Sequence, residues 1–185
     1  HGTRLIATGH GRRSLIRVLG QDDKTLGKSS RIRGPVHTGA FSLELTDASH
    51  LKPGDRIMVT RPSKEDWIVA TGMSRFWAAD DAPRIWKAGE LDITWDRTIK
   101  AIDNNTVTLD APLSVDIDPD WGGGYIIPYT WPGRITQVGV ENLQLVSAYD
   151  TGYPRDEDHA WMGVTLEKVT DAWIRSVTFR HFVGS

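Results

Sequence analysis

The segment 148–159 gathers several carboxylates and an imidazole in one polar stretch of the chain. Asp156, Asp158 and His159 are its candidate catalytic residues. Hydrolysis of a glycosidic bond needs two carboxyl groups, one of them protonated, flanking the bond. Elimination beside a uronate carboxylate instead needs a base and a cation that neutralises the carboxylate. The alternative is structural: the carboxylates solvate the loop or pair with Arg155, while His159 anchors it.

Calcium is the one cofactor that these residue types indicate. Asp156 and Asp158 could contribute to a Ca²⁺ site, because Ca²⁺ prefers several oxygen ligands. A second acidic run, 116–120, mimics the start of an EF-hand loop. Its sixth position is Trp121 rather than Gly and its twelfth is Ile127 rather than Glu, so that motif fails. The metal ligands, if a metal binds, stay unassigned.

Arg180 is a candidate substrate-binding residue. It falls on the outward face of its strand if Val177 and Phe179 point inward, since side chains alternate along a strand. An outward guanidinium can grip a substrate carboxylate through two parallel hydrogen bonds. The alternative is an ordinary solvated or ion-paired arginine.

Three tryptophans, Trp77, Trp86 and Trp95, are candidates for contacting sugar. They lie in the least periodic stretch of the chain, 62–97, which we expect to be a long ordered loop. A flat indole ring packs well against the C–H face of a pyranose. The alternative is that a small subdomain with few aliphatic residues uses tryptophan as its core.

The elements that position these residues repeat in the last third of the chain. Segments 140–146 and 174–180 match position for position, and the strand Met162–Glu167 lies between them. Neither a tight hairpin turn nor a helix separates them. Short recurring strands of this kind predict the stacked windings of a β-solenoid, in which Leu145 and Phe179 share one layer.

The middle of the chain has a different pattern. Apolar and polar residues alternate over 41–45, and Thr98–Ile102 and Thr106–Leu109 flank the turn residues of a hairpin. This region predicts a small antiparallel β subdomain, and no segment shows a convincing helical period with caps. The predicted fold is therefore all-β.

Three regions follow from these patterns. Residues 1–34 form the first part of the β-helix, 35–133 the inserted antiparallel subdomain, and 134–185 the continuing windings. The stretch 182–185 follows a strand without a polar cap, and an open solenoid end exposes apolar surface. We expect further windings, from a cleaved remainder of the same product or from another chain, to cover it.

Composition excludes several classes of function. The absence of cysteine excludes a disulfide framework and a thiolate nucleophile, and no apolar run approaches the roughly 20 residues of a membrane span. Residues 1–37 carry eight basic against two acidic residues. Aromatic residues are sparse there, so a nucleic-acid platform is not expected.

Three segments of the chain carry a family resemblance: Gly139-Val140-Glu141-Asn142-Leu143, the loop 156–162 and 169–174. In these segments the chain resembles the bacterial pectate-lyase-like right-handed parallel β-helix proteins. It is greatest to large secreted members with a β insert after the first coil. It implies a carbohydrate-active protein that is secreted or periplasmic. That superfamily includes lyases, glycoside hydrolases and non-catalytic adhesins, and no reaction-defining signature is present.

These observations predict part of a polysaccharide-degrading enzyme, a lyase or a glycoside hydrolase, that binds glycan along the groove of the stacked strands. Asp156, Asp158 and His159 would form its catalytic or metal-binding loop. The alternative is a non-catalytic β-helix that binds glycans or serves as an adhesin or fibre segment, in which these three residues are dispensable.

Overall fold

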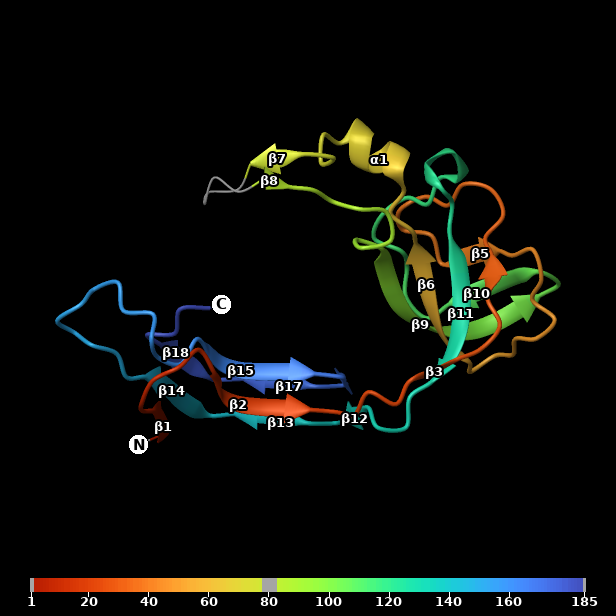
Figure 1. Ribbon diagram of the computed structural model, residues 1–185. Coiled ribbons are helices and arrows are strands. Elements are labelled where there is room, and N and C mark those ends of the chain that lie inside the picture. Colours follow the sequence, from red (N-terminus) through yellow and green to blue (C-terminus); the bar gives the residue numbers. More distant parts are fainter. Residues whose placement is uncertain (1, 78–82, 185) are drawn as a thin grey trace. The chain divides into compact units, whose positions relative to one another are not determined.

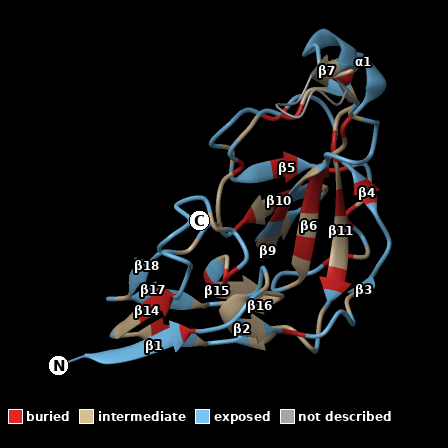
Figure 2. Ribbon diagram, turned by 60° about the vertical axis from the view of Figure 1, so that its left-hand side comes forward, coloured by how far each residue is buried: buried red, intermediate tan, exposed pale blue. Residues whose placement is uncertain are grey.

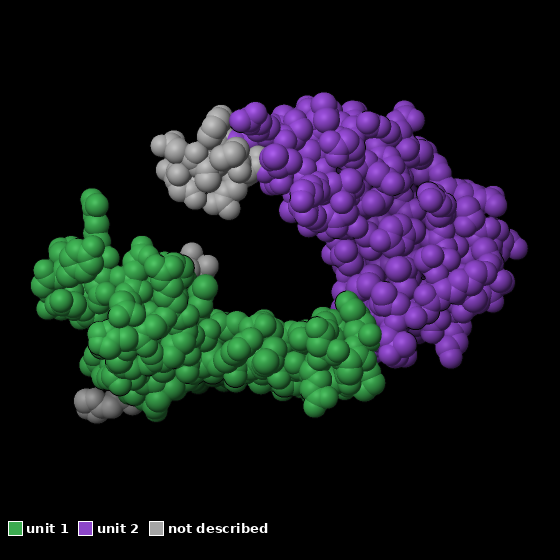
Figure 3. Space-filling model, in the orientation of Figure 1, with its two compact units in different colours: residues 1–24, 131–185 green, residues 25–130 purple. Residues whose placement is uncertain are grey.

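A computed structural model describes the backbone of residues 2–77 and 83–184. The chain divides into two compact units (Figure 3): unit 1 comprises residues 1–24 and 131–185, and unit 2 comprises residues 25–130. The described part of the chain is all-β apart from one short α-helix and one 3-10 turn (Figure 1). No helix in this part is long and apolar enough to span a membrane.

Unit 1 consists of short strands that pair in parallel. β14 lies between β1 and β18 in a three-stranded sheet, and three further parallel pairs are β12 with β16, β13 with β17, and β2 with β15. The strands of unit 1 are β1 (Thr3–Ala7), β2 (Ser14–Leu19), β12 (Ile135–Thr136), β13 (Gly139–Glu141), β14 (Leu143–Ser147), β15 (Met162–Glu167), β16 (Val169–Thr170), β17 (Trp173–Arg175) and β18 (Thr178–Arg180).

The predicted register of the repeat is confirmed. Val140 pairs with Ile174 and Leu145 with Phe179, both in parallel, so the two segments that match in sequence lie directly over each other. The strand predicted between them at Met162–Glu167 is β15, and it pairs with β2. Parallel neighbours cannot be joined by a tight turn, which is why each pair is separated by a long stretch of chain.

The corners of the two repeat segments adopt the same backbone conformation. Asn142 and Ser176 have φ of 54° and 52°, and Gln137 and Asp171 have φ of 55° and 50°. The members of each pair occupy equivalent positions of the repeat, so the left-handed bend recurs at the same place in both segments. Non-glycine residues rarely adopt this region, with Asn and Asp favoured, and two matched pairs show that the bends belong to the repeat.

Burial in unit 1 depends on neighbours in the stack. Leu145, on the middle strand β14, is fully buried, whereas its partner Phe179 on β18 remains 45% exposed. Leu5, on the other flanking strand, is also exposed. A side chain in this stack is therefore covered completely only where a strand lies on both sides of it.

The two points where the chain passes between the units are joined within unit 1. Gln21 N–H donates to the Gly133 carbonyl (2.9 Å), Gly133 N–H donates to Asp23 Oδ1 (2.9 Å), and Trp131 Nε1–H donates to the Gln21 carbonyl (2.8 Å). Two cations lie near the Trp131 ring, with Lys24 Nζ 4.8 Å and the Arg134 guanidinium carbon 5.1 Å from its centroid. The entry and exit segments therefore lie side by side.

Unit 2 is built on a seven-stranded antiparallel sheet. Along its main path the strands follow the order β3-β11-β6-β9-β10-β5, and β4 also pairs with β11. These strands are β3 (Thr25–Leu26), β4 (Ser30–Arg31), β5 (Ser42–Glu44), β6 (Arg56–Arg61), β9 (Ile93–Asp103), β10 (Thr106–Leu109) and β11 (Tyr125–Thr130). The hairpin predicted around 103–105 is confirmed as β9–β10.

The core of unit 2 lies on one face of this sheet. Ile57 and Val59 of β6 and Val107 of β10 are fully buried, as alternation along a strand requires (Figure 2). The remaining members of the cluster come from the other strands and from the connecting loops. Unit 2 therefore has a continuous hydrophobic core of its own.

The stretch 62–97 is more regular than the sequence pattern predicted. It contains the helix α1 (Glu65–Ala70), a small antiparallel pair β7 (Phe76–Trp77) and β8 (Pro83–Arg84), and the start of β9. The prediction of a long loop without helix is therefore wrong here. The helix is only six residues long, so it is too short to display a 3.6-residue period in the sequence. A 3-10 turn, η1 (Pro119–Trp121), lies elsewhere in unit 2.

Candidate functional site

The loop 148–161, between β14 and β15, is anchored at its far end by His159. The imidazole is only 4% exposed, and its Nδ1 lies 2.8 Å from Ser147 Oγ. Its Nε2 lies 3.1 Å from the carbonyl oxygen of Asp156. Both ring nitrogens are thus engaged inside the protein. This arrangement matches the anchoring alternative for His159 and leaves neither nitrogen free to exchange a proton with a bound substrate.

Asp156 organises the backbone of the same loop. Its carboxylate accepts the N–H of Asp150 (2.8 Å) and the N–H of Asp158 (2.9 Å). These two backbone hydrogen bonds, the one from Asp150 foremost, hold the pKa of Asp156 below its ordinary value. The group is therefore ionised at neutral pH and closes the loop on itself.

Asp158 ties the loop to the turn that follows β1. Its Oδ1 accepts the N–H of Gly11 (2.9 Å), and its Oδ2 lies 2.9 Å from His10 Nδ1. An ion pair across the same contact joins Glu157 to Arg12 at 3.1 Å. The side chains of all three candidate catalytic residues therefore contact other groups of the protein.

Arg12 and Trp161 form one side of this contact. The Arg12 guanidinium carbon lies 4.3 Å from the Trp161 ring centroid, a cation–π distance, and the Trp161 Nε1–H donates to the Glu157 carbonyl (2.9 Å). The indole is partly exposed. Its orientation is consequently fixed from two directions.

A cavity of about 550 Å³ opens beside the loop. Two guanidinium groups, three carboxylates and one phenol line it: Arg12, Arg155, Asp156, Glu157, Asp158 and Tyr153. The Tyr153 side chain is largely exposed, and Arg155 makes no ion pair within the described part of the chain. The lining is thus rich in donors and acceptors that suit a hydroxylated ligand.

The carboxylates of Asp156 and Asp158 both contact other groups of the protein. Each oxygen of Asp156 already accepts a backbone hydrogen bond, and the oxygens of Asp158 contact Gly11 and His10. The contribution of these carboxylates to a calcium site, which would need several oxygen ligands, stays a prediction. Among residues 2–77 and 83–184, no group of three or more His, Cys, Asp or Glu side chains is placed to hold a metal ion.

Arg180 lies on exposed β18, on the opposite face of the strand from Phe179. It pairs in register with Val146 and is not among the residues that line the polar cavity. The structure therefore does not bring Arg180 into the site at the loop.

The three candidate tryptophans have different surroundings. Trp95 is only 7% exposed, packs in the core of unit 2, and donates its Nε1–H to Ser114 Oγ (2.9 Å). Its proposed contact with sugar is therefore wrong, because neither ring face is open to a ligand. Trp86 stacks on Trp67 at 6.1 Å between centroids and forms a T-shaped contact with Phe76 at 6.0 Å. The backbone of Trp77 belongs to β7, but its side chain lies outside the described residues.

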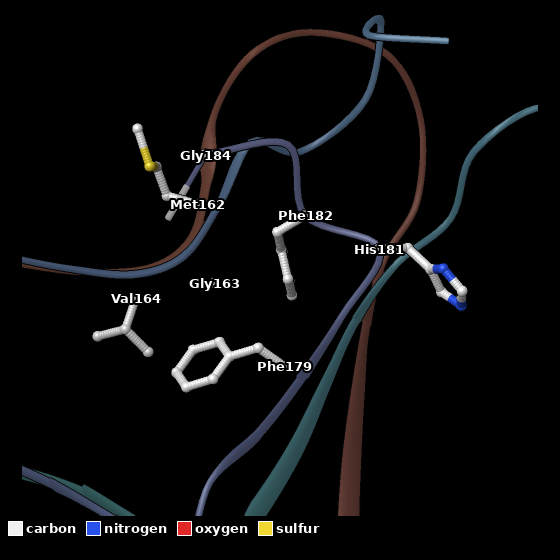
Figure 4. Close-up of a pocket in the computed structure, with 7 residues that line it drawn as sticks. All are labelled: Met162, Gly163, Val164, Phe179, His181, Phe182 and Gly184. Atoms are coloured by element: carbon white, nitrogen blue, oxygen red, sulfur yellow. The ribbon is translucent and has the colours of Figure 1, made fainter. Parts of the chain in front are cut away.

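A second cavity, of about 380 Å³, lies beside β18 (Figure 4). Its lining is mostly apolar: Met162, Gly163, Val164, Phe179, His181, Phe182 and Gly184. The rings of Phe179 and Phe182 meet edge to face with centroids 6.3 Å apart, while the His181 ring points away from them. This cavity has the character of a packing surface and offers little to a polar ligand.

His10 and Arg12, the partners of the loop, were not identified from the sequence. The register of the parallel strands indicates that these residues lie beside the loop. Ala7 pairs with Ser147, so the residues that follow Ala7 must lie beside the residues that follow Ser147.

No protein-family model matches the chain, and no curated protein sequence matches it either. Among solved structures it is similar to the tailspike protein gp49 of Pseudomonas phage LKA1 (TM-score 0.43, 16% identity, 96% of this chain and 26% of that one). It is also similar to the tailspike gp61 of Pseudomonas phage phi297 (TM-score 0.42, 17% identity, 93% and 24%). A third is the gp54 tailspike of Acinetobacter baumannii bacteriophage AP22, solved in complex with A. baumannii capsular saccharide (TM-score 0.41, 11% identity, 96% and 30%). The chain thus spans between 24% and 30% of the length of these proteins.

Proposed function

We propose that unit 1 is a segment of a right-handed parallel β-helix of the pectate-lyase-like type, and that it binds a polysaccharide at the loop 148–161. The repeated parallel register supports the β-helix, since Val140 lies over Ile174 and Leu145 over Phe179. Right-handedness follows the general preference, because crossovers between parallel strands are right-handed in nearly all proteins. A protein that binds polysaccharide in this way meets its ligand outside the cytoplasm, so we place it in the secreted or periplasmic class.

The observation that carries the binding function is the open polar cavity beside a loop with fixed geometry. Arg12 and Trp161 are held by Glu157, and Tyr153 and Arg155 stand exposed at the rim. A preorganised site loses little conformational entropy when it binds its ligand. An aromatic ring beside hydrogen-bonding charged groups is suited to a sugar, which has both apolar C–H faces and hydroxyl groups.

Binding is better supported than bond cleavage by this unit alone. Glycoside hydrolysis requires a carboxyl group that is protonated near neutral pH, and the backbone hydrogen bonds to Asp156 act in the opposite direction. His159 has both nitrogens engaged, so it lacks a free position for acid or base work. The lyase or hydrolase function would need groups other than these three.

The test is a glycan microarray probed with the full chain, repeated with Tyr153→Ala and Arg155→Ala. Both residues are exposed lining residues of the cavity, so their removal should leave folding intact. We expect each variant to bind the selected glycan about tenfold more weakly, about 1.4 kcal/mol. Arg17→Ala is the matched control, since Arg17 pairs with Glu167 on the β2–β15 ladder and does not line the cavity.

A parallel assay follows reducing ends and unsaturated-uronate absorbance with the same glycans. We expect no product from the chain, and no difference between the wild type and Asp158→Ala. Glycan binding that is unchanged in both cavity variants would refute the loop as the binding site. Product formation that Asp158→Ala or His159→Ala abolishes would replace the binding function by an enzymatic one.

A further inference from the structure

The outer face of the β13–β17 ladder carries a second group of residues suited to a ligand. Gly139 pairs with Trp173, and Glu141 pairs with Arg175. Val140, between the two residues of β13, is buried, so its neighbours on either side point outward. The four residues therefore share one exposed face. None of them lines the polar cavity beside the loop 148–161.

The Trp173 ring lies against the backbone of Gly139. A Cβ atom at residue 139 would overlap the indole, so only glycine leaves room for the ring in this position. The Trp173 Nε1–H donates to Glu141 Oε1, which fixes the rotation of the ring. Trp173 nonetheless remains 43% exposed. An indole that is supported from below, restrained at its nitrogen and open to solvent is a preorganised flat surface.

The charges beside this ring neutralise each other. Arg175 Nη2 donates to Glu141 Oε2 at 2.9 Å, while Oε1 of the same carboxylate is held by Trp173. The hydrogen bonds from Arg175 and then from Trp173 lower the pKa of Glu141, so it is ionised and matches the arginine charge. The face thus has hydrogen-bonding groups without a net charge. Arginine has five N–H donors, and the others remain available to a ligand.

We propose that Trp173, with Glu141 and Arg175, forms a separate carbohydrate-binding subsite that takes a neutral pyranose. The apolar C–H face of the sugar packs on the indole, and its hydroxyl groups bond to the free donors of Arg175 and the outer lone pairs of Glu141. A uronate gains nothing here, because Glu141 already neutralises the guanidinium. The subsite depends on residues of β13 and β17 alone and is independent of the loop 148–161.

The experiment is a titration of the full ¹⁵N-labelled chain, observed at the indole N–H resonances. The probes are cellohexaose, mannohexaose and galactohexaose as neutral glycans and hexagalacturonate as the charged one. We expect at least one neutral hexamer to shift the Trp173 indole resonance and to bind at least tenfold more tightly than hexagalacturonate. Trp173→Ala should abolish this binding, and Trp173→Phe should retain part of it.

Two further variants separate this subsite from the loop. Glu141→Gln keeps an acceptor for Trp173 but leaves Arg175 unneutralised, so hexagalacturonate should then bind about tenfold more tightly than to the wild type. Arg155→Ala should leave the Trp173 response unchanged, even if the loop binds no glycan at all. The proposal is overturned if no neutral hexamer shifts the Trp173 resonance, if Glu141→Gln leaves the preference unchanged, or if Arg155→Ala removes the response.

Discussion

Ser147 and His159 form a buried side-chain hydrogen bond of 2.8 Å that joins the end of β14 to the far end of the loop 148–161. The serine hydroxyl also lies 3.0 Å from the Ala160 carbonyl, so the contact fixes both a side chain and the backbone beside it. The loop therefore begins and ends at one buried polar contact. Its geometry is set before any ligand arrives.

Removing either partner should destabilise the protein. Ser147→Ala leaves His159 Nδ1 buried without its partner, and an unsatisfied buried polar group costs about 1–3 kcal/mol. We expect that loss in the free energy of urea unfolding at pH 7, together with faster hydrogen exchange in 148–161. His37→Ala is the control, since the His37 side chain is exposed and its Nδ1 lies 3.7 Å from Asp116 Oδ2. An unchanged unfolding curve for Ser147→Ala would contradict the anchoring role.

Acid should loosen the loop through Asp156. Its folded pKa lies below the ordinary value of 3.8, so its contribution to stability is fully present above that pH. The contribution is lost as the pH falls through the folded pKa, because protonation turns one of the two oxygens that accept the N–H groups of Asp150 and Asp158 into a hydroxyl. Hydrogen exchange at these two amides, corrected for the intrinsic pH dependence, should lose protection below about pH 4.

Asp156→Asn provides the comparison for this pH dependence. The amide cannot accept at both of its terminal atoms, so one of the two backbone contacts is lost at every pH. The variant should show weaker protection at pH 7 and little further change on acidification. Equal pH dependence in the wild type and Asp156→Asn would assign the effect to another group.

Gly20→Ala should be strongly unfavourable. An added Cβ would overlap the carbonyl oxygens of Lys168 and Gly133, which are backbone atoms and cannot turn away as a flexible side chain would. Overpacking of this kind costs about 1–3 kcal/mol, and the melting temperature should fall accordingly. Gly2→Ala is the matched control, because nothing lies within 4 Å of its added Cβ. A melting temperature equal to that of the control would show that the backbone around Gly20 can shift to accept a Cβ atom at little cost.

Trp95 and Trp86 should differ in how much they stabilise unit 2. Trp95→Ala empties a core position and removes the partner of Ser114, with an expected cost of about 3–5 kcal/mol. Trp86→Ala removes a partly exposed ring that stacks on Trp67 and should cost less, about 1–2 kcal/mol. Urea unfolding followed by circular dichroism measures both. The reverse order would place Trp95 outside the core.

The regular parts of the fold could be predicted because the order of apolar and polar residues along short segments indicates them. The position-by-position match of 140–146 with 174–180 predicts the pairing of Val140 with Ile174, and apolar alternation around 103–105 predicts the β9–β10 hairpin. The helix α1 was missed because six residues do not establish a period. Trp95 was misplaced because an amphipathic indole suits a core and a sugar site equally well.

The candidate site could be predicted only in part. The polarity of 148–159 marked the loop, but the roles of Asp156 and His159 depend on which backbone groups their side chains meet. Those partners include the turn at 9–13, far away in sequence, whose proximity follows from the strand register rather than from any motif. The sequence shows a tryptophan at position 173, but its exposure and its contact with Gly139 depend on the strand pairing in the folded protein.

The hydrogen bond between Gln21 and Gly133 bears on how unit 2 could have been inserted into unit 1. The segments of unit 1 that lead into and out of residues 25–130 are hydrogen-bonded to each other through Gln21 and Gly133. Trp131 adds a further hydrogen bond to Gln21. A cassette whose ends are held this close can be exchanged for a short connecting turn, or for an unrelated module, without moving the strands that flank it. The attachment site lies within unit 1, so we expect that recombination can replace the inserted unit while unit 1 keeps its fold.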